Sequence, residues 1–232
     1  MSALLAHAIG ASPAATAGAG LRGRPLRWIE DGPIGLWATE WNGDRALARD
    51  DAFAHHALLS ALCATGPCLP VRFGTWLEGE EAAIRALREG RERFLARLGR
   101  VGGRLEVGLT LLWREAPSPK GRGHAVAASG RAYLERRRAM HAATAERRAE
   151  ADAIATRLAW ELAVEQGDVR HESCPSDEVA LAMSVLAKTG EAEALKARAV
   201  AVTAALPGLR GVVSGPWPPY SFSEEIGAGG GS

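Results

Sequence analysis

The sequence has almost no excess of charge of either sign and few cysteines, and each shortage excludes a class of protein. Its 232 residues carry 28 basic and 27 acidic side chains, for a net charge of +1. Nucleic-acid binding gains much of its affinity from Lys and Arg that displace counterions from phosphate, and this balance offers no overall field for that purpose. Three cysteines are too few for a disulfide-stapled secreted domain. We therefore expect a cytoplasmic protein that binds no nucleic acid.

Long hydrophobic runs are also missing. No stretch approaches the roughly 20 apolar residues that a helix needs to cross a bilayer. The apolar start, Ala3 to Ile9, has no preceding Lys or Arg and is interrupted by His7, which is unlike a secretory signal. Hydrophobic residues make up 47% of the chain and charged residues 24%, which is typical of a globular protein. We expect a soluble protein with no membrane partner.

Motifs for catalysis, cofactor binding and metal binding are weak or absent. The run from Gly18 to Gly23 matches the letters of a dinucleotide fingerprint, but a strand-like segment follows where a phosphate site needs a helix. His55 and His56 precede Cys63 by seven or eight residues, and Cys63 and Cys68 have a spacing that zinc ligands use, but the cysteine pair straddles Gly66-Pro67 and lacks the second similar cluster that zinc prefers. No G-x-S-x-G elbow, P-loop or H-E-x-x-H is present. We expect no enzyme activity, catalytic residue, cofactor or metal.

The first 100 residues mix strand-like and helix-like patterns, which predicts an N-terminal α+β domain. Extended segments are expected at 3–9, 26–30, 34–41 and 69–75, and helices at 45–64 and 79–98. The turn residues Asp31-Gly32-Pro33 predict a hairpin between the second and third segments, and Asp44 is a candidate N-cap for the first helix. Three glycines between residues 99 and 103 predict a domain boundary.

The second half has the element order βαββαβ, the ferredoxin-like plan. Strands are expected at 105–113, 167–173, 179–187 and 209–214, and helices at 131–165 and 191–206. The first and third of these strands are the most apolar, as the central strands of a 4-1-3-2 sheet should be. The long helix would span about 50 Å, against roughly 20–30 Å for a strand of the sheet. Its middle, Glu135 to Glu150, should therefore project into solvent or meet a partner.

Three short segments combine aromatic side chains with Pro, Gly or Arg: Leu69–Thr75, Ser129–Leu134 and Ser214–Phe222. The last holds three prolines, which favour polyproline geometry, and three aromatic side chains, which offer large apolar area. We expect this tail to pack on its own domain, because exposed aromatic tails are liabilities. The candidate contacts, for tail docking or for a partner, are Arg72, Phe73, Tyr133, Trp217, Tyr220 and Phe222.

These segments resemble the gas vesicle protein GvpL/GvpF family, over residues 69–222 and most specifically in Ser214–Phe222. The resemblance implies an N-terminal α+β domain (1–100), a ferredoxin-like domain (101–215) and a C-terminal tail (216–232) folded against the body. It also implies a non-catalytic assembly role. In that role the protein would associate with the small gas vesicle shell protein and other accessory proteins, in the cytoplasm and at the gas vesicle.

Two other interpretations stay open on the sequence alone. A ferredoxin-like domain serves many roles, and a cleft between two domains could hold a small molecule, as in a ligand-binding or regulatory module. An enzyme would require reactive side chains that converge in space. The sequence does not separate the F type from the L type.

Overall fold

The structure is a computed structural model that describes residues 3–12, 18–114 and 130–223, with side chains from residue 145 onward in the last range. The chain divides into two compact units. Unit 1 consists of Met1–Glu106 together with Trp217–Ser232, and unit 2 is the continuous segment Val107–Pro216. Unit 1 is therefore built from two separate stretches of the chain.

Unit 1 contains an antiparallel sheet whose central strand is the first in the sequence. The strands are β1 (Ala3–Gly10), β2 (Leu26–Asp31), β3 (Ile34–Trp41), β4 (Cys68–Pro70) and β5 (Trp76–Leu77). β1 pairs with β3 on one side and with β4 and β5 on the other, and β2 pairs with β3. All eight residues of β1 are buried. Since successive side chains point to opposite faces of a sheet, both faces are covered at this strand.

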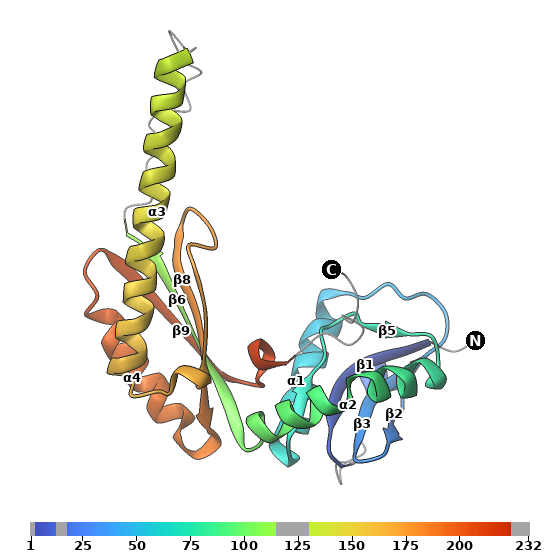
Figure 1. Cartoon of the computed structure of the whole chain (residues 1–232). Coiled ribbons are helices and arrows are strands. Elements are labelled where there is room, and N and C mark those ends of the chain that lie inside the picture. The colour runs from blue at the N-terminus through green and yellow to red at the C-terminus, as the bar shows by residue number, and fades with distance from the viewer. Residues whose placement is uncertain (1–2, 13–17, 115–129, 224–232) are drawn as a thin grey trace. The chain divides into compact units, whose positions relative to one another are not determined.

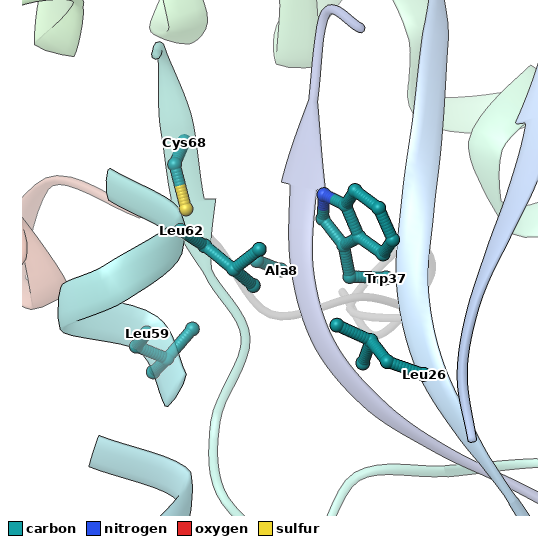
Figure 2. Close-up of a cluster of buried hydrophobic side chains, with 6 residues drawn as sticks. All are labelled: Ala8, Leu26, Trp37, Leu59, Leu62 and Cys68. Carbon is teal, nitrogen blue, oxygen red and sulfur yellow. The ribbon is translucent and has the colours of Figure 1, made fainter. Parts of the chain in front are cut away.

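The cover comes from two helices, α1 (Arg49–Thr65) and α2 (Glu80–Val101). α1 packs against β1 and β4, and α2 packs against β2, β3 and β4 (Figure 1). One buried cluster joins α1 to the sheet, and in it Leu62 points toward Ala8 (Figure 2). Its other members are Leu26, Trp37, Leu59 and Cys68. Burying each large apolar side chain contributes roughly 1.5–3 kcal/mol, so this cluster is a main source of the unit's stability.

The predicted hairpin is confirmed, because β2 and β3 pair from Leu26 with Thr39 to Asp31 with Ile34. Gly32 has a φ of 69° in the turn, which glycine adopts without strain. The predicted extended run 69–75 is only partly right. Strand β4 ends at Pro70, and the chain pairs with β1 again only at β5.

Helix α1 begins later than residue 45, and the prediction that Asp44 is its N-cap is wrong. Asp44 Oδ1 accepts the N–H of Ala46 (3.0 Å) in a turn that precedes the helix. Asp51, in the first helical turn, accepts the Ala48 N–H at Oδ2 (2.7 Å). Hydrogen bonds from Arg22, together with the one from Ala48, lower the pKa of Asp51 to about 2. A charged carboxylate at this end also suits the helix dipole.

Helix α2 runs past Gly99, which was expected to break it. It ends at Val101, and the next residue, Gly102, donates its N–H to Leu98 O at 3.0 Å. The apolar residue Leu95 of this helix is exposed. The buried row is Ala83, Leu87, Gly90, Phe94, Leu98 and Val101.

Unit 2 contains the second antiparallel sheet, with two helices. Its strands are β6 (Arg104–Trp113, of which the first three residues belong to unit 1), β7 (Val169–Ser173), β8 (Val179–Lys188) and β9 (Leu209–Trp217). The order across the sheet is β7-β8-β6-β9. The helices are α3 (Gly130–Glu161) and α4 (Ala192–Ala204). Short 3-10 turns occur at Leu21–Gly23 (η1), Gln166–Asp168 (η2), Thr189–Glu191 (η3) and Tyr220–Phe222 (η4).

The core of unit 2 lies between the sheet and its helices. Alternate residues of β6 and β8, such as Val107, Leu109 and Met183, are buried, and so are Leu158 and Leu162 near the end of α3. The first half of α3 extends past the strands of unit 2 (Figure 1). Its side chains up to residue 144 lie outside the described part of the chain. Among the described residues, no helix is both long enough and apolar enough to span a bilayer.

Candidate partner-binding site

The C-terminal segment turns back onto unit 1 through η4. Phe222 is only 2% exposed, and Arg97 Nη1 donates to its carbonyl oxygen at 3.2 Å. The N–H and the hydroxyl of Ser221 donate to the two oxygens of the buried Glu106 carboxylate, at 2.8 and 2.7 Å. A buried carboxylate without such donors would be costly, so the segment completes the structure around Glu106. The expected polyproline geometry does not continue here, because Pro219 has φ −76° and ψ 63°.

Two aromatic residues of this segment stay partly exposed and enclose His56 of α1. The Tyr220 hydroxyl lies 2.7 Å from His56 Nδ1, and the Trp217 ring packs edge-on against the imidazole at 5.1 Å between centroids. Burial raises the pKa of Tyr220, so its hydroxyl keeps its proton and remains in a hydrogen bond with His56 Nδ1. This bond fixes the Tyr220 ring in place beside α1.

A hollow of about 410 Å³ opens next to these rings. It lies between α1, the residues that follow β4, and the C-terminal segment. Its lining residues are Ala52, His55, His56, Pro70, Arg72, Phe73, Tyr220 and Ser223. Phe53, the next residue along α1 from Ala52, is 60% exposed. Exposed aromatic side chains beside a hollow are typical of the centre of protein–protein interfaces.

A buried polar network starts from His55, one of the residues that line this hollow. A one-residue bulge in β1 at His7 interrupts the pairing with β3, and a bulge re-aims a side chain. The His7 ring reaches His55 (Nδ1 to Nδ1, 3.0 Å) and Thr39 (Nε2 to Oγ1, 2.7 Å). His55 Nε2 reaches the Val71 carbonyl (3.2 Å), and the Leu21 N–H donates to Thr39 Oγ1 (3.4 Å).

These contacts permit one consistent assignment of protons. The Val71 oxygen can only accept, so His55 carries its proton on Nε2 and accepts at Nδ1 from His7. His7 then accepts at Nε2 from the Thr39 hydroxyl. Burial and the neighbouring His55 lower the pKa of His7 to about 3, and burial also lowers that of His55. Both rings are therefore neutral at pH 7.

The six residues singled out in the sequence have different places in the structure. Arg72, Phe73 and Tyr220 line the hollow, and Trp217 packs against His56. Phe222, near the end of the C-terminal segment, is buried. The side chain of Tyr133, on α3, lies outside the described part of the chain.

Sequence reasoning missed His7, His55 and Glu106. His7 stood out only as a polar residue in an apolar strand. Nothing in the sequence indicated that it contacts His55, 48 residues away.

The cysteines near this site are not arranged as reactive thiolates. Cys63 and Cys68 lie close together as free thiols. The hydrogen bond with Cys63, together with burial, raises the pKa of Cys68 well above its usual range. Among the described residues, no three His, Cys, Asp or Glu side chains are grouped so that they could hold a metal ion.

Residues 4–224 match the sequence model of the family described as gas vesicle synthesis protein GvpL/GvpF. The chain belongs to this family. It is 32% identical to gas vesicle protein L of Streptomyces sp. (strain CB03234) over 192 residues, which cover 75% of this chain and 69% of that protein. It is 29% identical to gas vesicle protein F of the same strain over 215 residues, covering 87% and 89%.

Two crystal structures of gas vesicle protein GvpF have a similar fold. The protein from Anabaena sp. PCC7120 aligns with a TM-score of 0.70 at 16% identity, covering 97% of this chain and 99% of that one. The protein from Microcystis aeruginosa aligns with a TM-score of 0.74 at 14% identity, covering 97% and 100%. The GvpL/GvpF fold therefore extends over nearly the whole chain.

Proposed function

We propose that this member of the GvpL/GvpF family acts in gas vesicle assembly by binding other proteins, without catalysis. Its partners would be the small gas vesicle shell protein and other accessory proteins, and it would work in the cytoplasm and at the vesicle. The observation that carries the proposal is the hollow of unit 1, which Tyr220 lines. Trp217 packs against the lining residue His56, and Phe53 is exposed on the same helix, α1.

The physical reason lies in what a gas vesicle shell requires. A shell protein must be apolar on its gas face, so its unassembled form tends to aggregate. A partner that covers apolar side chains until they are incorporated would prevent this. Aromatic side chains suit that task because they bury large area and lose little side-chain freedom.

We propose further that unit 2 is a ferredoxin-like domain. The element order β6-α3-β7-β8-α4-β9 and the sheet order β7-β8-β6-β9 support this. The division into domains at 1–100 and 101–215 and a tail at 216–232 stays a prediction. The contacts of Ser221 and Phe222 suggest that the tail works as part of the first domain.

The direct test is co-purification of the chain with the small shell protein under vesicle-forming conditions. We expect Phe53→Ala and Trp217→Ala each to weaken binding about tenfold or more, as loss of an aromatic interface residue commonly does. Val200→Ala, at an exposed apolar residue on α4 of unit 2, is the matched control and should bind normally. Unchanged binding by both aromatic variants would place the contact elsewhere, and no binding by the wild type would refute the proposal.

The hollow also supports a second candidate, a small-ligand-binding or regulatory module. Its volume of about 410 Å³ lies within the range of small-molecule sites, and Arg72 and Tyr220 supply polar groups next to Phe73. A thermal-shift screen of metabolites against the wild type and Tyr220→Phe distinguishes the two functions. A tight ligand whose effect depends on Tyr220 would favour the module.

A further inference from the structure

Strand β7 is an edge of the unit 2 sheet, and its outward-facing backbone groups can be identified. In the described part of the chain it pairs only with β8, from Val169 with Val185 to Ser173 with Leu181. The next residue, Cys174, donates its N–H to Ala180 O at 2.9 Å. Backbone groups along an antiparallel strand alternate in direction, so those of residues 170 and 172 also point toward β8. Those of residues 171 and 173 point away from the sheet, and so does the carbonyl of Val169, whose N–H donates to Gln166 O.

The sequence of this edge is complementary to itself in one register. Two copies of β7 can form an antiparallel pair only if their outward residues, 169, 171 and 173, face each other. If the two-fold axis passes through His171, then Arg170 lies opposite Glu172 of the second copy, and Glu172 opposite its Arg170. An axis through residue 170 or residue 172 would instead place like charges opposite each other, which destabilises a sheet. The charges therefore select the pairing centred on His171.

The same pairing brings the charged residues close together. Residues 170 and 172 would occupy the non-hydrogen-bonded positions, where opposite Cα atoms are only about 4.5 Å apart. The outward N–H and C=O groups of residues 171 and 173, with the Val169 carbonyl, would meanwhile form the hydrogen bonds of the new ladder, while the Val169 N–H keeps its bond to Gln166 O. The same register thus provides main-chain hydrogen bonds and charge pairing together.

An exposed tryptophan lies beside this edge. Trp160, in the last turns of α3, is 82% exposed, the largest exposed fraction among the large apolar side chains described. It borders a hollow of about 640 Å³ that runs from α3 to the start of β7. Ala155, Ala159, Val164 and Val169 supply apolar lining. A sheet continued across β7 would place a second unit 2 against this hollow and cover both indoles.

We propose that a second copy of this chain docks on the β7 edge, forming a two-fold symmetric dimer with a continuous eight-stranded sheet. Such an interface uses the same surface on both copies, as most homodimers do. The dimer goes beyond the proposed role of unit 1 in binding the shell protein. It involves different residues and does not require that role.

The test is the molecular mass of the full chain in solution, measured without any other gas vesicle protein by sedimentation velocity. We expect the wild type to change from about 24.4 kDa to twice that mass as its concentration rises. Trp160→Ala should raise the dissociation constant about tenfold or more. Trp217→Ala, which removes an exposed tryptophan of unit 1, should leave it unchanged. A wild type that stays monomeric at high micromolar concentration would overturn the proposal. This would hold even if β7 were then found to bind a strand of another protein.

Charge variants test the register itself. Arg170→Glu and Glu172→Arg should each be monomeric, because like charges then face each other across the axis. An equimolar mixture of the two should form a heterodimer, since every facing pair is again opposite in charge. The double variant Arg170→Glu/Glu172→Arg should dimerise alone, which also shows that these changes are compatible with folding. Dimerisation by the single variants, or none in the mixture, would contradict the pairing centred on His171.

Discussion

At the scale of single residues, the packing under the Trp28 ring leaves no room for a further side-chain atom. Trp28 and Trp37 lie opposite each other on β2 and β3, with ring centroids 5.0 Å apart. Gly35 lies beneath this pair, and a methyl group there would come within 2.3 Å of Trp28. The glycine is needed for space and not for its backbone freedom.

Gly35→Ala is therefore expected to destabilise unit 1 by about 1–3 kcal/mol, the usual cost of overpacking. Gly10→Ala is the matched control, because its new methyl group would meet its nearest atoms at 3.6 Å, an ordinary contact. The measurement is the free energy of unfolding from urea titrations followed by tryptophan fluorescence. Equal losses for the two variants would contradict the packing argument.

The buried histidines give stability a defined dependence on pH. His7 has a folded-state pKa of about 3 against 6.5 when unfolded, so between these values the unfolded chain binds a proton that the folded chain does not. Stability contributed by His7 is therefore complete above pH 6.5 and is lost as the pH falls. Between pH 7 and pH 5 the loss from His7 alone should be about 2 kcal/mol.

Urea titrations across this range measure the slope, and His7→Val should flatten it even though the variant is less stable at pH 7. His171→Asn, which removes an exposed histidine of unit 2, should retain the wild-type dependence. An unchanged slope in His7→Val would show that His7 is not the residue responsible.

At the scale of elements, residues of the C-terminal segment have two different roles: some stabilise unit 1, and others are available to contact a partner. Phe222 is buried, whereas Trp217 is partly exposed at the surface. Phe222→Ala should lower the free energy of unfolding of unit 1 by about 3 kcal/mol or more, as for other buried aromatic residues. Trp217→Ala should change stability little and partner binding strongly. Thermal unfolding of the two variants, compared with their binding of the shell protein, distinguishes a structural residue from a contact residue.

The elements that the sequence predicted well are those set by local pattern. The strand β6, the turn at Gly32 and the helix α2 could be predicted because each depends on residues that are close together in the sequence. The start of α1 was predicted wrongly because Asp44 and Asp51 are both plausible caps. The contact that favours Asp51 comes from Arg22, 29 residues earlier.

At the scale of the whole molecule, the α+β class and the family could be predicted from the sequence, but the site could be predicted only in part. Arg72, Phe73 and Tyr220 were named from three segments, and their common hollow was not foreseen. Besides these residues, His55 and His56 of α1 line the hollow. The hollow therefore brings together Phe73 and Tyr220, which are about 150 residues apart in the chain. No local pattern contains that information.

The expectation for the living cell follows from the proposed function. Deleting this gene in a vesicle-forming cell should abolish or reduce buoyancy, and the wild-type gene should restore it. A gene carrying Phe53→Ala and Trp217→Ala should restore it poorly, although the protein accumulates normally. Buoyancy and electron microscopy of assembly intermediates provide the measurement, with Val200→Ala as the control. Full restoration by the double variant would count against the hollow as the working surface.

Unit 2 is inserted into unit 1, and this has a consequence for synthesis on the ribosome. Domains generally fold as their residues emerge, and unit 2 is a single uninterrupted stretch. Unit 1 must wait, because Glu106 and the slot for Phe222 stay incomplete until the chain has been made through residue 222. A nascent chain halted before that point would have a folded unit 2 and an incompletely folded unit 1. The proposed binding surface, which includes Trp217 and Tyr220, would thus become competent only after residue 222 has been translated.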